Sequence, residues 1–327
     1  AVLQEILYAV QGIEGQYVLL DPISDAFCIT EEARVPRGTK DIVRQICEVG
    51  WLFSKIDEHV KTSSMSSLLH QSLCASIKSH LSEYYKLLSL LQSELKVPGS
   101  SALSMRKLLA WMHEPAKRLK HILIIADGCQ DLKGGALASK VHAYVMHGDP
   151  TVRSLLTDIM RVTFQPLLQM IIAWATEGEL ADPFQEFFVM QDKNATDDQF
   201  WAWRYSLSPH MIPSFIPEAL ANKILLIGKS LNFIRTQCGD AQWAMRQEVL
   251  AQVPRDGSVF DTTTTLFSGL DGFVTAALNQ VNKRLMHLLF VRYKFDKHAH
   301  AIKQYLLLSR GDFIQNLMDN LQSTLGR

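Results

Sequence analysis

Apolar residues recur at steps of three and four along most of the chain, which is the pattern of amphipathic α-helices. One stripe runs from Leu69 to Leu95 over about seven turns, and another continues from Leu266 to Tyr305. Asp261 is placed to cap that second helix, Gly311 interrupts its pattern, and Asp312 is placed to cap a last helix. Because no fixed repeat period is present, the sequence predicts an all-α protein, an elongated stack of irregular helical bundles.

Two segments leave the helical pattern and predict small β-hairpins. At 17–30, two short apolar runs flank a turn, and within 184–207 we expect strands at 184–190 and 202–207. The second segment is rich in aromatic residues, which favours packing against the helices. These aromatic residues are Phe184, Phe187, Phe188, Phe200, Trp201, Trp203 and Tyr205.

Prolines and capping residues suggest where the middle helices begin. Ser101 is placed to open a short helix, and Pro115 suits the first turn of the next one. Further helices are expected at about 136–147, 151–163 and 166–177.

Composition and charge exclude several classes of protein. The chain is 47% hydrophobic and 20% charged with zero net charge, which predicts a folded chain that binds no nucleic acid. Its densest basic patch is read as a solvated helix face, formed by Lys117, Arg118, Lys120 and His121. The longest apolar run, 167–175, is too short to cross a bilayer, so no membrane partner is expected.

Cysteine usage indicates a reducing compartment. The five cysteines are an odd number at wide spacings, and no CxxC pair is present for a zinc or thioredoxin-type site. Their neighbours are mostly apolar, so we expect buried free thiols in a cytosolic protein. These cysteines are Cys28, Cys47, Cys74, Cys129 and Cys238.

One segment has part of the phosphate-binding loop motif. Gly228, Lys229 and Ser230 match its end, but the motif needs a glycine five residues before Gly228, where Lys223 stands. The preceding residues also continue a helical pattern instead of a strand and a loop. We therefore predict that Gly228 packs against a neighbouring helix.

Other candidate sites are also better explained by structure. Gly12 and Gly15 lack the third glycine of a dinucleotide fingerprint and predict a helix stop and a turn. His298 and His300 are two residues apart, so a helix points them to different faces, and no metal or other cofactor is expected.

An acidic stretch follows the middle helices. Glu177, Glu179 and Asp182 form a polar loop with Glu186 close behind, and we expect these carboxylates to be solvated. No GxSxG elbow is present, although a Ser-His-Asp site assembled from distant residues stays open. The motifs therefore predict a helical protein that is not an enzyme and acts through its surface.

Five blocks along the chain resemble, in order, the shared region of gamma-tubulin complex components. The blocks are 3–15, 180–189, 201–215, 223–233 and 305–313. Their signature positions are Gly12, Gly15, Phe187, Phe188, Trp201, Trp203, Tyr205, Pro213, Phe215, Gly228, Lys229, Asn232, Gly311 and Asp312. Further residues are similar to the third component of that family, namely 133–139, His142, Tyr144, Gly148 and Asp149.

The resemblance implies a scaffold with two halves. Residues 1–310 would be the N-terminal helical-bundle (Grip-type) domain, which packs laterally against a neighbouring component, commonly the second. Residues 311–327 would begin the C-terminal half, which grips gamma-tubulin, and most of that half would be missing. The variable extension that recruits a small Mozart-type partner would also be absent. Such components array gamma-tubulins to nucleate microtubules at the centrosome or spindle pole body, in the cytoplasmic cytoskeleton.

Two alternatives remain at this point. A rod subunit of another assembly, such as a membrane-tethering complex, shares long bundles but not the ordered blocks, and an enzyme with an unfamiliar site is the other. The signature positions are read mostly as fold-keeping, with partner contact as the second role, chiefly for Trp201, Trp203 and Tyr205.

Overall fold

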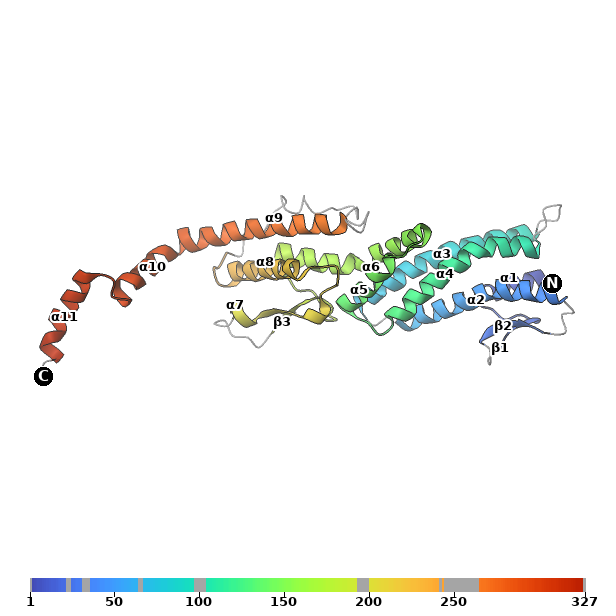
Figure 1. The fold of residues 1–327 in the computed structure, drawn as a ribbon, viewed down its shortest axis with the longest axis horizontal. Coiled ribbons are helices and arrows are strands. Elements are labelled where there is room, and N and C mark those ends of the chain that lie inside the picture. The colour runs from blue at the N-terminus through green and yellow to red at the C-terminus, as the bar shows by residue number, and fades with distance from the viewer. Residues whose placement is uncertain are drawn as a thin grey trace.

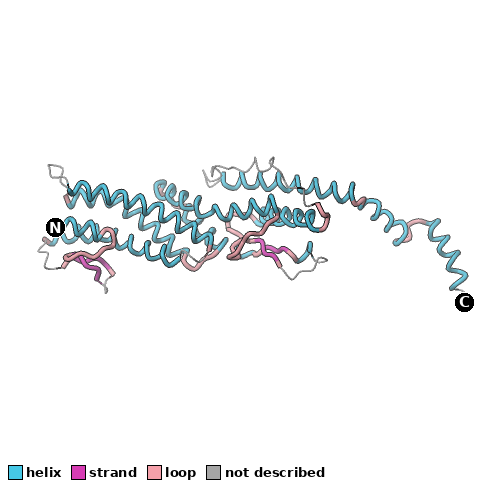
Figure 2. Tube along the Cα trace, turned by 180° about the vertical axis from the view of Figure 1, so that it is seen from behind, coloured by secondary structure: helices cyan, strands magenta, loops and turns pink. Residues whose placement is uncertain are grey.

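The computed structural model describes residues 2–21, 25–30, 36–63, 67–96, 104–192, 200–240, 243 and 265–325. These residues form an elongated rod of helices, from which a helical arm extends at the C-terminal end (Figure 1). Two small antiparallel sheets lie along the same side of the rod (Figure 2). The predicted all-α stack with two small hairpins is confirmed.

One end of the rod is a bundle of long helices. It contains α1 (Val2–Ala9), α2 (Arg37–Ser63), α3 (Leu68–Lys96) and α4 (Met105–Cys129). Helix α2 packs along α4, and the apolar stripes of all four helices are buried in one core. Helix α1 crosses α2 at Gly50, where a Cβ atom would lie 1.9 Å from the carbonyl oxygen of Ala9 and the missing side chain permits the contact.

Helix α6 (Pro150–Glu177) joins this bundle to the rest of the rod. It packs against α3, against α5 (Gly134–Val145) and against α8 (Glu218–Thr236). The expected break into two helices is wrong because α6 continues through Pro166. A single uninterrupted helix therefore passes from one part of the rod to the other.

Helix α4 is also one helix where two were expected. Pro115 lies inside it instead of in a first turn, and Ser104 caps its start by accepting a hydrogen bond from the Lys107 backbone N–H at 3.2 Å. The predicted cap Ser101 lies outside the described residues. Continuous packing against α2 compensates the backbone hydrogen bond that the proline removes.

The two sheets are shorter than the sequence pattern suggests. Strand β1 (Val18–Asp21) pairs with β2 (Ala26–Ile29), and β3 (Val189–Gln191) pairs with β4 (Tyr205–Leu207). A one-turn helix, α7 (Phe200–Trp203), precedes β4 where an extended strand was expected. Both sheets lie beside helices that carry the core.

The arm begins with α9 (Thr265–His287), which packs along α8. The prediction of a single helix through Tyr305 is wrong. A π-helical turn at Leu288–Arg292 ends α9, and Lys294 then takes a left-handed conformation with φ 49°. The predicted cap Asp261 lies outside the described residues.

A second break of the same kind follows one short helix later. Helix α10 (Phe295–Ala301) ends in a π-helical turn at Ile302–Leu306, and Leu308 has a left-handed backbone conformation with φ 51°. Helix α11 (Gly311–Leu325) then completes the arm, which curves away from the rod in Figure 1.

Candidate interaction surfaces

The first signature positions shape the turn after α1. Gly12 adopts φ 74° and its N–H donates to the carbonyl of Ala9 at 2.9 Å, which ends the helix. The Glu5 carboxylate accepts a hydrogen bond from the Tyr17 N–H at 2.7 Å, and a Cβ at Gly15 would lie 3.0 Å from that same carboxylate. Both glycines therefore lead the chain tightly from α1 into the first hairpin.

Phe187 and Phe188 lie in the core between the two parts of the rod. Both side chains are buried, and their ring centroids are 4.4 Å apart. The Asp182 carboxylate fixes the backbone before them by accepting the Phe187 N–H at 2.7 Å. These residues hold the loop against the helices, away from the surface.

Glu186, next to this pair, is fully buried and links two helix starts. Its carboxylate accepts the N–H of Leu68 at 2.7 Å and of Leu69 at 3.4 Å, at the start of α3. The other oxygen accepts the N–H of Gly134 at 3.4 Å, at the start of α5. Helix N-termini carry partial positive charge, so this carboxylate stabilises both ends at once.

The predicted solvation of the acidic stretch is therefore wrong for its last member, and it holds only in part for Asp182, which is partly buried and accepts the Phe187 N–H. Glu177 and Glu179 are exposed, whereas Glu186 is buried because the two helix starts supply the donors that a carboxylate needs. The arrangement is one for stability and not for acid–base chemistry, since the buried carboxylate is enclosed by backbone donors.

The block around Gly228 fixes α8 against α6. A Cβ at Gly228 would lie 1.9 Å from Cε2 of Trp174, so only glycine permits this contact. The Trp174 indole N–H donates to the carbonyl of Ile224 at 2.9 Å, which holds the ring in place. Gly228 thus packs against a neighbouring helix.

Lys229 and Asn232 extend this contact to the second hairpin. The Lys229 ammonium donates to the carbonyl of Trp201 at 3.0 Å, and burial lowers its pKa. The Asn232 side-chain amide donates to the carbonyls of Gly178 at 2.8 Å and Gly228 at 3.0 Å. Removing an ammonium from water costs free energy, and the hydrogen bond to Trp201 offsets part of that cost. The same bond holds α7 in position.

The aromatic residues of the second hairpin divide between core and surface. Tyr205 is buried with its ring 5.0 Å from that of Trp174. Trp201 touches Phe233 edge-on but stays exposed, and Trp203 is 68% exposed. The expectation that the whole segment packs down is wrong for Phe184, which is exposed, and for these two tryptophans, which face solvent from an anchored helix.

Pro213 and Phe215 close the rod beside α5 and α6. Pro213 is buried, and the Phe215 ring stacks on that of Phe164 at 4.9 Å. A Cβ at Gly135 would lie 1.9 Å from the carbonyl oxygen of Met211, so α5 approaches this backbone closely.

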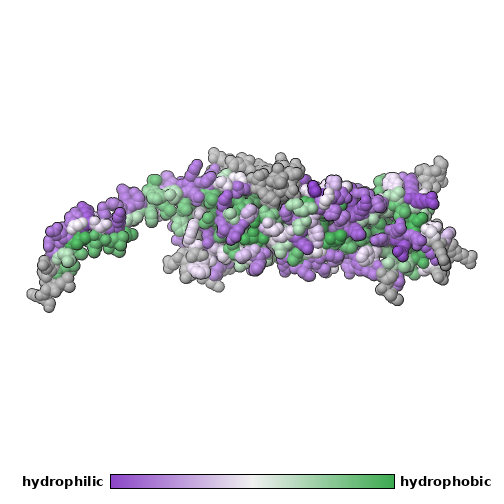
Figure 3. All heavy atoms as spheres, viewed as in Figure 1, coloured by the Kyte–Doolittle hydropathy of each residue, from purple (hydrophilic) through white to green (hydrophobic). Residues whose placement is uncertain are grey.

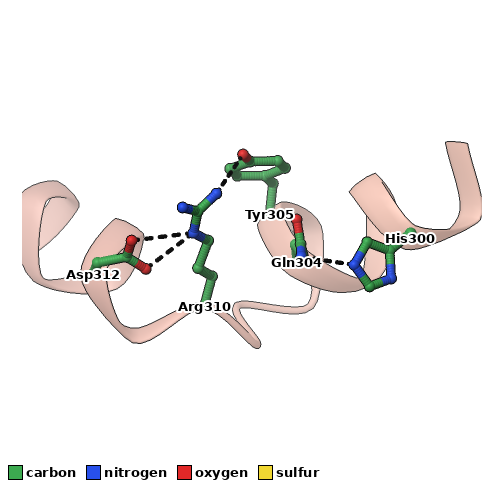
Figure 4. Close-up of polar contacts among 5 residues, drawn as sticks. All are labelled: His300, Gln304, Tyr305, Arg310 and Asp312. Carbon is green, nitrogen blue, oxygen red and sulfur yellow. Dashed lines mark hydrogen bonds and ion pairs between the residues drawn. The ribbon is translucent and has the colours of Figure 1, made fainter. Parts of the chain in front are cut away.

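Gly311 and Asp312 lie at the second break of the arm. Arg310 reaches both carboxylate oxygens of Asp312 at 3.1 Å and donates to the Tyr305 hydroxyl at 3.0 Å, as Figure 4 shows. Gln304 and His300 also form a hydrogen bond of 2.8 Å on the neighbouring turn. These exposed contacts brace the bend from outside.

We searched the described residues for metal sites, membrane-spanning helices and reactive thiols. They contain no cluster of three His, Cys, Asp or Glu residues with metal-binding geometry. None of their helices is both long and apolar enough to span a membrane.

The five cysteines are free. Burial raises the pKa of Cys47 to about 12 and of Cys129 to about 11, which disfavours reactive thiolates. Cys28 is exposed, so the prediction of buried thiols is wrong there.

Comparison with known proteins decides the family. The sequence model described as "Gamma tubulin complex component N-terminal" matches residues 3–291. The chain belongs to the gamma-tubulin complex component family. It is similar to gamma-tubulin complex component 3 of Arabidopsis thaliana, with 37% identity over 97% of this chain and 40% of that protein.

Two other relatives support the same family. Gamma-tubulin complex component 3 of Homo sapiens is 36% identical over 100% of the chain and 37% of its own length. A spindle pole body component of Schizosaccharomyces pombe is 32% identical over 99% of the chain and 41% of its length. The chain thus spans about two fifths of the curated relatives it matches.

Proposed function

We propose that this chain is the N-terminal region of a structural subunit of the gamma-tubulin complex, and that it has no enzymatic role. The observation that carries the proposal is the match of the family model to nearly the whole rod. The rod supports it, because the continuous α6 and the buried carboxylate of Glu186 resist bending between the two bundles. A stiff body suits a scaffold that sets the spacing of its neighbours.

In this role the rod associates laterally with neighbouring components, the second component first among them. Gamma-tubulin binding belongs to the region that begins near residue 311, at α11, and the arrayed gamma-tubulins template a microtubule. The names of the relatives support a cytoplasmic location at the microtubule-organising centre, since one is a spindle pole body component. The family match favours this role over a membrane-tethering rod.

The signature positions take two roles within this proposal. Gly228, Lys229 and Asn232 hold α7 against α8 from inside the rod. Trp201 and Trp203 stand at the surface on that anchored helix, and we assign them to the lateral contact. Exposed, preorganised tryptophans are typical anchors of protein interfaces.

Co-expression with the second component tests the lateral contact. Sedimentation velocity should show a heterodimer, and the double variant Trp201→Ser, Trp203→Ser should weaken it about tenfold or more. Met146→Ser is the control, because Met146 is similarly exposed on the turn between α5 and α6. A well-folded chain that forms no heterodimer, or a heterodimer unaffected by the tryptophan changes, would contradict the assignment.

A further inference from the structure

A second surface lies between α3 and α4, away from the tryptophans of α7. The two helices run antiparallel and are joined by two ion pairs, Lys107 with Glu94 at 3.0 Å and Arg118 with Glu83 at 3.9 Å. Glu83 precedes Glu94 by eleven residues and Arg118 follows Lys107 by eleven, so both pairs fit one register. The ion pairs therefore bracket about 16 Å of helix, or three turns.

At the Glu83–Arg118 end of this stretch the helices leave a hollow, which extends past that ion pair. A cavity of about 310 Å³ opens there, with its apolar lining from Tyr84, Leu87, Leu119, Ile122 and Leu155. The floor is rigid, because these side chains belong to the core and the Tyr84 hydroxyl donates to the carbonyl of Val10 at 2.9 Å. The hollow is thus a preformed apolar site and not a loose surface.

Trp111 lines the hollow, and a second exposed apolar side chain lies across the groove from it. The register of the ion pairs places Leu90 opposite Trp111, and these side chains are 60% and 43% exposed. Large exposed apolar residues beside an apolar hollow mark a binding surface. A stripe of three turns has the length that an amphipathic helix needs to dock through residues i, i+4 and i+7.

The charges around the mouth favour one kind of helix. Glu83 and Arg118 compensate each other, whereas Glu114 forms no ion pair within the described part of the chain. Pro115 has no N–H, so the carbonyl of Trp111 lacks its usual helical donor beside the same mouth. Within the lining of the hollow this leaves a carboxylate and a carbonyl that attract a cationic donor, while Lys117 and His121 lie beside Glu114 in a neighbouring hollow.

We propose that the groove between α3 and α4 binds a short amphipathic helix of a partner protein, with a large apolar residue in the hollow and a Lys or Arg facing Glu114. This surface is separate from the lateral contact through α7, so the two assignments stand or fall independently. The occupant is a protein helix and not a small molecule, because the exposed apolar surface continues past the lining residue Leu87 to Leu90 on α3.

A labelled peptide tests the groove directly. The probe is a fluorescein-labelled, alanine-based helix with Leu, Trp and Leu at i, i+4 and i+7 and two lysines beside the stripe. Fluorescence polarisation with the full 327-residue chain should show saturable binding. Trp111→Ser should weaken binding about tenfold, and Glu114→Lys should weaken it about threefold, with the effect of charge fading at high salt.

Matched controls separate binding from folding. Ile124→Ser removes an apolar side chain of α4 with the same 43% exposed fraction outside the hollow and should leave peptide affinity unchanged. Leu87→Trp, which fills the hollow, should abolish binding without lowering the unfolding midpoint. Equal affinity for wild type and Trp111→Ser, or tighter binding of a peptide with glutamates in place of the lysines, would overturn the proposal. Self-association of the chain that Trp111→Ser abolishes would make a second copy the occupant and overturn it as well.

Discussion

Gly228 controls how closely α8 approaches α6. A methyl group there would overlap the Trp174 ring, which is held by its hydrogen bond to Ile224. We expect Gly228→Ala to lower the free energy of unfolding by about 2–3 kcal/mol in urea titrations. Gly272→Ala on α9 is the control, because a Cβ there meets nothing within 4 Å, and helix propensity should make it neutral or stabilising. Equal destabilisation by both changes would contradict the packing role.

Glu186 is a second residue whose identity decides stability. Its two oxygens accept three backbone N–H groups, and Glu186→Gln would turn one acceptor into a donor that faces them. We expect a loss of about 1–3 kcal/mol of unfolding free energy, measured in urea. Glu179→Gln changes an exposed carboxylate of the same stretch and should stay within about 0.5 kcal/mol.

One buried and one partly buried histidine predict how stability depends on pH. Burial lowers the pKa of His70, which also lies 3.3 Å from the Ser67 hydroxyl, and burial lowers the pKa of His80. In the unfolded chain these histidines have the ordinary pKa of 6.5, so they bind protons there at a higher pH than in the folded chain. The free energy of unfolding therefore falls as the pH drops through 6.5. Unfolding midpoints should decrease from pH 7.5 to 5.5. His70→Gln should flatten this dependence, and a slope equal to that of the wild type would contradict the assignment.

At the scale of the elements, Pro166 distinguishes two descriptions of α6. If a helix began at Pro166, the proline would suit its first turn, and Pro166→Ala would be neutral or destabilising. Inside the continuous helix, the same change restores a backbone hydrogen bond and should raise the free energy of unfolding by about 1–3 kcal/mol. Pro166 is partly buried, so packing also contributes to the measured change in unfolding free energy. Gln169→Ala at an exposed position of α6 is the reference for an effect of helix propensity alone.

The sequence predicts elements better than it predicts how they connect. Helical periodicity places most helices and both hairpins, because the period follows directly from which side chains are buried. Local signals fail at Pro115 and Pro166, where tertiary packing compensates a missing hydrogen bond, and at Lys294 and Leu308, which are unusual residues for left-handed helix ends. The burial of Glu186 could not be predicted from the sequence, because its hydrogen-bond donors lie 52 to 118 residues away along the chain.

At the scale of the whole molecule, the rod and the arm differ in how they cover apolar residues. In the rod one core runs through the packed helices, whereas the arm beyond α9 carries large exposed apolar side chains. Figure 3 shows them gathered along one face of the arm. They include Val291, Phe295, Ile302, Leu306, Leu307 and Met318.

Such a face should make this chain self-associate at high concentration, because contiguous exposed apolar area drives contact with other molecules. Leu306 is 78% exposed and Leu307 is similar, so Leu306→Ser with Leu307→Ser should keep the fold. We expect the double variant to remain monodisperse in sedimentation velocity at concentrations where the wild type forms larger species. Ile13→Ser, an exposed apolar change at the opposite end of the molecule, should leave the association as it is. If both variants associate like the wild type, the arm does not drive the contact, and the groove between α3 and α4 becomes the surface to test next.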